Sequence, residues 1–268
     1  MDYLKVLLEV LEESKSKIVE SLKNPAVFKP VYGKPLLVDK LAEKVVVDSL
    51  SERIGGFTLI SEEAGMVKVN GGGNLVAVLD PIDGSTNASR GFPIYSTSLA
   101  LAEGYSLSDV VAGGVIDFPK GDVYYAARGV GAFLNGRRIT VSKIKVLSES
   151  VITLDVSAKG KAFKYLSLLS PIVEKAYSVR SLGSNAIHLC MVASGVFDAF
   201  IDLRSVLRAI DASAGILIVK EAGGVVIDGF GAELNFKLAV DTRISLIAAS
   251  TAELASEIVN LLEFKPKS

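Results

Sequence analysis

Apolar residues recur with helical spacing in two segments near the beginning of the chain, residues 4–22 and 37–54. In the second segment, positions 37, 41, 45, 46 and 50 fall on one face of a helix, which gives it a stripe to bury. Shorter apolar runs follow, and their length is typical of strands. They predict strands at 57–60, 75–80, 95–102, 110–117 and 123–127, followed by a hairpin at Asn135-Gly136.

From about residue 145 the chain alternates between strand-like and helix-like segments. The predicted strands are 151–156, 177–180, 197–202, 224–228 and 244–249, and the predicted helices are 160–170, 184–194, 212–222 and 251–263. Such alternation is typical of an α/β layer. The pattern therefore predicts an α+β fold followed by α/β, with an N-terminal α+β domain at residues 1–145 and a C-terminal α/β domain at 146–268.

The composition fits a chain with a large core. Half of the 268 residues are hydrophobic, and no apolar run approaches the roughly 20 residues of a membrane span. The amphipathic N-terminus carries acid early, unlike a signal peptide, and the lone Cys190 excludes an intrachain disulfide. A net charge of −1 argues against general nucleic-acid affinity. We expect a cytoplasmic protein without nucleic-acid or membrane partners.

The segment 75–87 carries the strongest chemical signal. Five apolar residues are followed by Asp80, Pro81, Ile82 and Asp83. Because Pro81 cannot donate a ladder hydrogen bond, we expect the strand to stop there. The two carboxylates would then lie close together, and they repel each other unless a cation such as Mg²⁺ lies between them. A Gly-Ser-Thr helix start follows, whose free N–H groups favour an anion. An ordinary Asp/Gly turn with a helix cap is the alternative.

The string Asp80-Pro-Ile-Asp-Gly-Ser-Thr-Asn87 resembles the signature of the inositol monophosphatase family, which comprises Mg²⁺-dependent, lithium-sensitive sugar phosphatases. Two further acids match the family pattern: Glu62 after a short strand, and Asp211 at the start of an apolar helical run. Ile210 stands where the family has Trp. The segment 202–211 resembles the archaeal branch, in which inositol phosphatase and fructose-1,6-bisphosphatase activities often coexist.

The resemblance implies a five-layered αβαβα sandwich of the sugar phosphatase type, with the active site between the two halves of the chain. It also implies a homodimer and two or three Mg²⁺ per site. The implied metal ligands are the side chains of four acids and one backbone carbonyl: Glu62, Asp80, the carbonyl of Ile82, Asp83 and Asp211.

The resemblance further assigns catalytic roles to Asp39, Glu62 and Ser85. Asp39, near the start of the 37–54 helix, would hydrogen-bond Ser85, and the two would orient a metal-activated water; a helix-start carboxylate is the alternative for Asp39. The backbone N–H groups of Gly84, Ser85 and Thr86 would hold the phosphate. Because catalysis of phosphoryl transfer is mainly positioning and charge stabilisation, no covalent phosphoenzyme is required.

Substrate contacts are implied at Ser184, Asn185 and Asp202, in addition to Asp83 and Asp211. Arginine binds phosphate bidentately, so Arg204 and Arg208 are candidates for a second phosphate such as that of fructose 1,6-bisphosphate. An ordinary strand-end Asp202 and solvated loop arginines are the alternatives. We expect the lone His188 and Cys190 to be packing residues of the 184–194 helix.

The resulting prediction is a phosphomonoesterase that acts on inositol 1-phosphate, with fructose 1,6-bisphosphate as a second substrate. Two alternatives stay open. One is a nucleotide 3′-phosphatase of the same superfamily, which would need an adenine pocket. The other is a non-catalytic regulatory protein built on this scaffold, although the four acidic ligands are intact.

Overall fold

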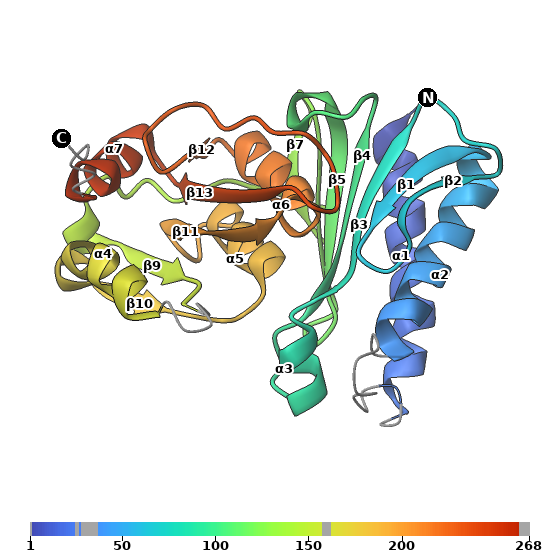
Figure 1. The fold of residues 1–268 in the computed structure, drawn as a ribbon, viewed down its shortest axis with the longest axis horizontal. Coiled ribbons are helices and arrows are strands. Elements are labelled where there is room, and N and C mark those ends of the chain that lie inside the picture. The colour runs from blue at the N-terminus through green and yellow to red at the C-terminus, as the bar shows by residue number, and fades with distance from the viewer. Residues whose placement is uncertain (1, 25–26, 28–36, 157–161, 263–268) are drawn as a thin grey trace.

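The molecule is built from five layers that lie side by side (Figure 1). The computed structural model describes residues 2–24, 27, 37–156 and 162–262. In order, the layers are helices α1 (Tyr3–Leu22) and α2 (Leu37–Ile54), an eight-stranded sheet, helices α5 (Asn185–Ala193) and α6 (Ala209–Glu221), a five-stranded sheet, and helices α4 (Ala162–Lys175) and α7 (Ala252–Leu261). This arrangement confirms the predicted αβαβα sandwich.

The eight-stranded sheet runs in the order β2-β1-β3-β4-β5-β6-β7-β8. Its strands are β1 (Phe57–Ser61), β2 (Gly65–Val69), β3 (Val76–Asp83), β4 (Ser96–Ala102), β5 (Val110–Asp117), β6 (Asp122–Ala127), β7 (Gly131–Leu134) and β8 (Arg137–Ile139). β1 and β3 are parallel, and the other pairs are antiparallel. The carboxyl ends of β1 and β3 therefore meet at one edge of the sheet.

The five-stranded sheet runs in the order β10-β9-β11-β13-β12. Its strands are β9 (Val151–Leu154), β10 (Ser178–Arg180), β11 (Ala199–Arg208), β12 (Val225–Ile227) and β13 (Arg243–Ala249). β9 is parallel to both β10 and β11, and β13 is antiparallel to β11 and β12. Single turns of 3₁₀ helix at Leu107–Asp109 and Leu147–Glu149, and the short helix α3 (Ser85–Arg90), connect these elements.

Three hydrophobic clusters fill the spaces between the layers. Strand β3 contributes to two of these clusters. Val76 and Val78 belong to the cluster with α5 and α6, and Ala77 and Leu79 belong to the cluster with α1 and α2. A strand that is buried on both faces needs a continuous apolar run, which is the pattern that the sequence has here. The predicted boundary at 145/146 falls between β8 and β9, and the middle cluster takes residues from both sides of it. The division into two domains stays a prediction.

Several element boundaries differ from the expected ones. Strand β2 was not predicted, because its residues are mostly exposed and show no alternation. Helix α4 continues past Pro171 to Lys175, although a proline has no N–H to donate within the helix, and the hydroxyl of Ser170 donates to the carbonyl of Ser167. β11 runs six residues beyond the expected end at 202, through a register shift against β13. Within the described residues, every helix is too short or too polar to cross a bilayer.

Candidate metal centre

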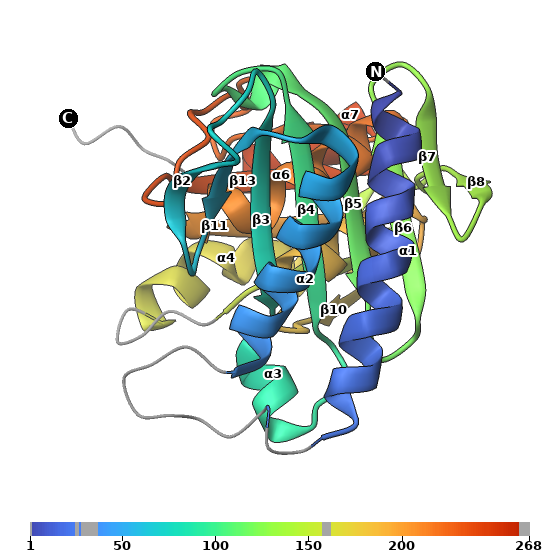
Figure 2. The ribbon, with the colours of Figure 1, turned by 90° about the vertical axis from the view of Figure 1, so that its right-hand side faces the viewer.

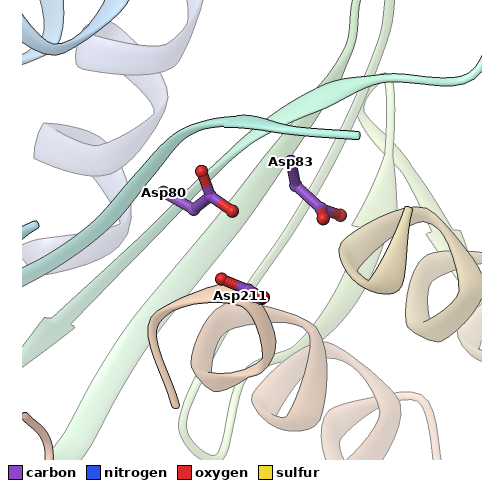
Figure 3. Close-up of side chains that lie close together, drawn as sticks. All are labelled: Asp80, Asp83 and Asp211. Atoms are coloured by element: carbon purple, nitrogen blue, oxygen red, sulfur yellow. The ribbon is translucent and has the colours of Figure 1, made fainter. Parts of the chain in front are cut away.

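Three buried carboxylates converge where the two halves of the chain meet (Figure 3). Asp80 and Asp83 come from the end of β3, and Asp211 comes from the first turn of α6. One oxygen of each carboxylate lies within 4.8 Å of the others, and none of the three residues is more than 4% exposed. The structure thus brings together three of the four acids that the sequence predicts as metal ligands.

A bulge in β3 aims both of its aspartates at α6. We expected the strand to stop at Pro81, and this was wrong, because the strand continues to Asp83. Its register against β4 shifts between Asp80 and Asp83, so that Pro81 and Ile82 together face only Thr97, whose hydroxyl donates to the Pro81 carbonyl at 2.5 Å. Residues three apart on a regular strand point to opposite faces, and the extra residue of the bulge cancels that difference.

Gly84 turns the chain from β3 into α3. It adopts φ +88°, and a Cβ built on it would lie 2.9 Å from the carbonyl oxygen of Ile94. Only glycine fits both conditions. The expected helix start is confirmed, with Gly84 as the N-cap of α3. Asn87 on this helix donates to the carbonyls of Ile94 and Leu182, and so fixes α3 against the segment that precedes α5.

Asp83 is held by the N-terminus of α5. Its Oδ2 accepts hydrogen bonds from the Ser184 hydroxyl at 2.6 Å and from the backbone N–H of Ala186 at 2.7 Å. Ser184 is also the N-cap of α5 and is fully buried. The sequence indicated Ser184 and Asn185 as sugar contacts and gave no sign of the bond to Asp83. The Asn185 side-chain oxygen is buried, and no hydrogen-bond partner for it lies among the described residues.

Arg208 connects the fourth predicted ligand, Glu62, to the cluster. The Arg208 Nη1 contacts Glu62, its Nη2 lies 3.1 Å from Asp80 Oδ2, and its Nε lies 2.8 Å from Asp211 Oδ1. Glu62 follows β1 directly, and its side chain is 44% exposed. The turn that carries it is fixed by Glu43, which accepts hydrogen bonds from the Ser61 hydroxyl and the Ala64 N–H.

Burial dominates the electrostatics of the cluster. It raises the pKa of Asp83 to about 7, with the charge of Asp211 adding to the rise and the Ser184 bond opposing it. Burial also raises the pKa of Asp80 and of Asp211, and the Arg208 charge opposes both shifts. Burial alone would lower the pKa of Arg208, but the surrounding carboxylates raise it above its ordinary value. Carboxylates that are this close and this buried favour a bound cation.

The donor set fits a hard divalent cation. Every side-chain ligand in it is a carboxylate oxygen, the kind that Mg²⁺ prefers. Asp80 Oδ1 is buried and has no hydrogen-bond partner among the described residues, so it is an oxygen that a metal ion would satisfy. Asp80, Asp83 and Asp211, with Glu62 beside them, are therefore the residues that could hold the metal.

The remaining catalytic candidates lie on α2, on α3 and in the bulge of β3. Asp39 is buried in the first turn of α2, and this end of α2 lies near α3 in both views (Figures 1 and 2). Ser85 begins α3 and is half-buried, Thr86 is exposed, and Ile82 lies in the bulge. The bond between Asp39 and Ser85, and the role of the Ile82 carbonyl, stay predictions.

Asp202 and Arg204 form an ion pair within β11, beside the carboxyl end of the parallel strand β9. The Arg204 Nη2 lies 2.5 Å from Asp202 Oδ2, and its Nη1 lies 2.8 Å from Asp155 Oδ1. Asp202 is fully buried, and the Arg204 side chain is only 7% exposed. The substrate roles predicted for these two residues stay predictions, because a substrate group would have to compete with this ion pair.

His188 and Cys190 are both fully buried on α5, as expected for packing residues. The His188 Nε2 accepts a hydrogen bond from the Leu182 N–H at 3.0 Å, and its ring packs against Phe200. Burial lowers the pKa of His188 to about 3, so the imidazole is neutral.

Comparison with known proteins identifies the family. Residues 12–267 match the model of the inositol monophosphatase family. The chain belongs to the inositol monophosphatase family. A fructose-1,6-bisphosphatase/inositol-1-monophosphatase of Methanothermobacter thermautotrophicus is 39% identical, over 85% of this chain and 82% of that protein. An inositol-1-monophosphatase of Aeropyrum pernix is 34% identical, over 85% of each chain.

Solved structures of this family share the fold. A Thermotoga maritima inositol monophosphatase superposes with a TM-score of 0.78 and 27% identity, over 98% of this chain and 97% of that one. The predicted family, the predicted layered fold and the predicted enzyme class, a phosphatase, are thereby confirmed.

Proposed function

We propose that this inositol monophosphatase family member is a Mg²⁺-dependent phosphatase that hydrolyses inositol 1-phosphate and, as a second substrate, fructose 1,6-bisphosphate. The observation that carries the proposal is the convergence of Asp80, Asp83 and Asp211 from both halves of the chain within 4.8 Å. The names of the archaeal relatives, which pair the two activities, support the choice of substrates.

Two or three Mg²⁺ per site, bound by Glu62, Asp80, Asp83 and Asp211 and by the Ile82 carbonyl, would lower the pKa of a water molecule and offset charge on the phosphate oxygens. The protein's own residues do the positioning. The bulge at Pro81 fixes the separation of Asp80 and Asp83, and the Ser184 hydroxyl fixes the rotamer of Asp83. These contacts support a centre whose ligands are preorganised.

Around the metals, α3 and α2 supply the groups that would bind the phosphate and orient the attacking water. The N–H groups of Gly84, Ser85 and Thr86 would donate to the phosphate oxygens, because Gly84 follows Asp83 directly and is the N-cap of α3, whose first N–H groups have no helical partner. The Ser85 hydroxyl would orient the attacking water, and the Asp39 carboxylate would accept its proton through Ser85. Phosphate then leaves without a covalent intermediate on the protein.

The substrate's alcohol side would contact the second half of the chain. Asn185 offers a buried side-chain oxygen that has no partner among the described residues, and sugar hydroxyls are suitable donors to it. Arg208 lies beside the cluster, whereas Arg204 is held by Asp155 and Asp202. We therefore assign a second phosphate to Arg208 rather than to Arg204, and sugar contacts to Asn185, Asp83 and Asp211.

We further propose a cytoplasmic homodimer whose partner is a small sugar or inositol phosphate, without nucleic acid or membrane. The family resemblance supports the dimer, and the net charge of −1 supports the absence of a nucleic-acid partner. The lone cysteine is consistent with a reducing compartment.

The test is phosphate release from inositol 1-phosphate and fructose 1,6-bisphosphate, measured side by side with Mg²⁺ and with excess EDTA. We expect turnover of both substrates with Mg²⁺ and of neither with EDTA. Turnover that survives EDTA would overturn the metal mechanism. Failure of both substrates in Mg²⁺, together with turnover of a nucleoside 3′-phosphate, would overturn the substrate assignment in favour of a nucleotide phosphatase.

A further inference from the structure

Arg208 occupies an unusual position among the acids of the metal centre. Each of its three guanidinium nitrogens contacts a different carboxylate: Nη1 contacts Glu62, Nη2 contacts Asp80 and Nε contacts Asp211. These acids come from three separate elements, namely the end of β1, the end of β3 and the first turn of α6. The guanidinium therefore offsets part of the negative charge of the ligand set from within.

The same carboxylates are the ones that would bind a divalent cation, and the two uses conflict. Asp80 is fully buried and Asp211 is 4% exposed, so water does little to screen a guanidinium from a metal ion at this centre. Two cations that share buried ligands repel each other, and metal binding has to remove Arg208 from at least part of this network. We propose that Arg208 is an internal counter-ion that competes with divalent metal for Glu62, Asp80 and Asp211, and thereby weakens and sets the metal affinity of the site.

The position of Arg208 in the fold allows it to leave. It is the last residue of β11 and the N-cap of α6, and its side chain is 23% exposed. Arg204, on the same strand, is 7% exposed and is enclosed by Asp155 and Asp202. The long, flexible stem of Arg208 can carry its guanidinium toward solvent, where it is well placed for an anionic substrate, whereas Arg204 has no comparable freedom.

The competition also has a consequence for stability. Buried carboxylates that are close together destabilise a fold unless a cation offsets their charge, and here either Arg208 or a metal ion can do so. Removal of metal by a chelator should therefore leave the protein folded, because Arg208 then offsets part of the charge of the carboxylates. This inference rests on the proposed function for the identity of the metal, but it concerns affinity and stability rather than turnover.

The variant Arg208→Met tests the proposal, because it removes the charge and keeps most of the stem. Mg²⁺ binding to the substrate-free protein would be measured by isothermal titration calorimetry, and thermal unfolding would be measured in EDTA and in saturating Mg²⁺. We expect the Kd for Mg²⁺ to fall at least about tenfold. We also expect the Tm in EDTA to fall and to be restored by Mg²⁺.

Arg53→Met is the matched control. Arg53 is 24% exposed and pairs with Glu9 and Glu13 on α1, away from the centre. Its loss should lower the Tm in both buffers and leave the Kd for Mg²⁺ unchanged. If Arg208→Met does not fold, Arg208→Lys keeps the charge and loses the three-way contact, and it should give a Kd between wild type and the value expected for a neutral residue.

An unchanged or weakened Mg²⁺ affinity in the Arg208 variants would overturn the inference. That result is distinguishable from failure of the proposed function, because it would be judged against a wild-type protein that binds Mg²⁺ and releases phosphate in its presence. A wild-type protein that binds no Mg²⁺ would overturn both.

Discussion

The hydroxyl of Ser184 donates a hydrogen bond of 2.6 Å to Asp83, which lies 101 residues earlier in the chain. The bond crosses from the N-terminus of α5 to the carboxyl end of β3, and so it joins the two halves of the protein at the metal centre. It fixes the orientation of Asp83 and opposes the rise that burial causes in the pKa of this carboxyl. Partners of this kind, one step outside the ligands, often control metal affinity.

Ser184→Ala should therefore weaken Mg²⁺ activation about 10- to 100-fold, as measured by titrating turnover with Mg²⁺. It should also cost about 1 kcal/mol of stability, because Ser184 caps α5. Thr251→Ala is the control, since Thr251 caps α7 in the same way and lies elsewhere. That variant should lose similar stability with normal Mg²⁺ activation. A Ser184 variant that changes only KM for substrate would instead favour the sugar-contact role that the sequence indicated.

Ser85→Ala tests the orientation of water. We expect kcat to fall about 100-fold, with a much smaller change in KM, because the hydroxyl acts on the attacking water and not on substrate binding. Ser89→Ala provides a control on the same helix, where the hydroxyl donates to the Thr86 carbonyl of that helix. Steady-state kinetics at saturating Mg²⁺ measure both values. A Ser85 effect confined to KM would rule out the proposed role.

Gly84→Ala should disrupt the turn into α3. The substitution forces φ +88° on alanine and brings its Cβ to 2.9 Å from the Ile94 oxygen. We expect a loss of about 1–3 kcal/mol in the free energy of unfolding and a large loss of turnover. Gly91→Ala at the other end of α3 is matched in φ, at +71°, but its Cβ meets nothing within 4 Å. Equal effects of the two variants in urea unfolding and turnover would show that the close approach at Gly84 has no role.

His188 should make stability depend on pH. Its pKa falls from about 6.5 in the unfolded chain to about 3 in the native state, so the unfolded state binds the extra proton between these values. This contribution to stability is present above about pH 6.5 and is lost as the pH falls, by about 1.4 kcal/mol per pH unit. His188→Gln keeps an acceptor for the Leu182 N–H and removes the titration. Urea unfolding at about pH 7 and about pH 5.5 should show wild type losing about 1 kcal/mol more than the variant; equal losses would contradict the prediction.

The sequence was most informative where a pattern is local. The two aspartates of β3 are three residues apart, and the apolar run before them is long enough to predict a buried strand. The hairpin at Asn135 and Gly136 was also predicted, and the structure places both residues at positive φ between β7 and β8. In both places, the residues that carry the sequence pattern are the same residues that form the strand or the turn.

What the sequence could not provide are contacts between distant segments. The bond from Ser184 to Asp83 joins residues that are far apart in the chain, and so do the ion pairs of Arg208 with Glu62 and Asp80. The residue types alone do not indicate these partners. The strand was expected to end at Pro81 because a proline lacks an N–H, but a bulge removes the need for that donor. β2 was missed because an exposed edge strand needs no alternation of apolar and polar residues.

The central claim is that Asp80, Asp83 and Asp211 hold the metal on which turnover depends, and Asp83→Asn tests it most directly. The asparagine keeps the size of the side chain and an oxygen that can accept from Ser184 and Ala186, but it removes the ligand charge. Phosphate release from inositol 1-phosphate would be measured across Mg²⁺ concentrations, with urea unfolding to confirm the fold. We predict a folded protein whose turnover is lower by at least about 1,000-fold. A folded variant with near-normal turnover and an unchanged Mg²⁺ requirement would contradict the account.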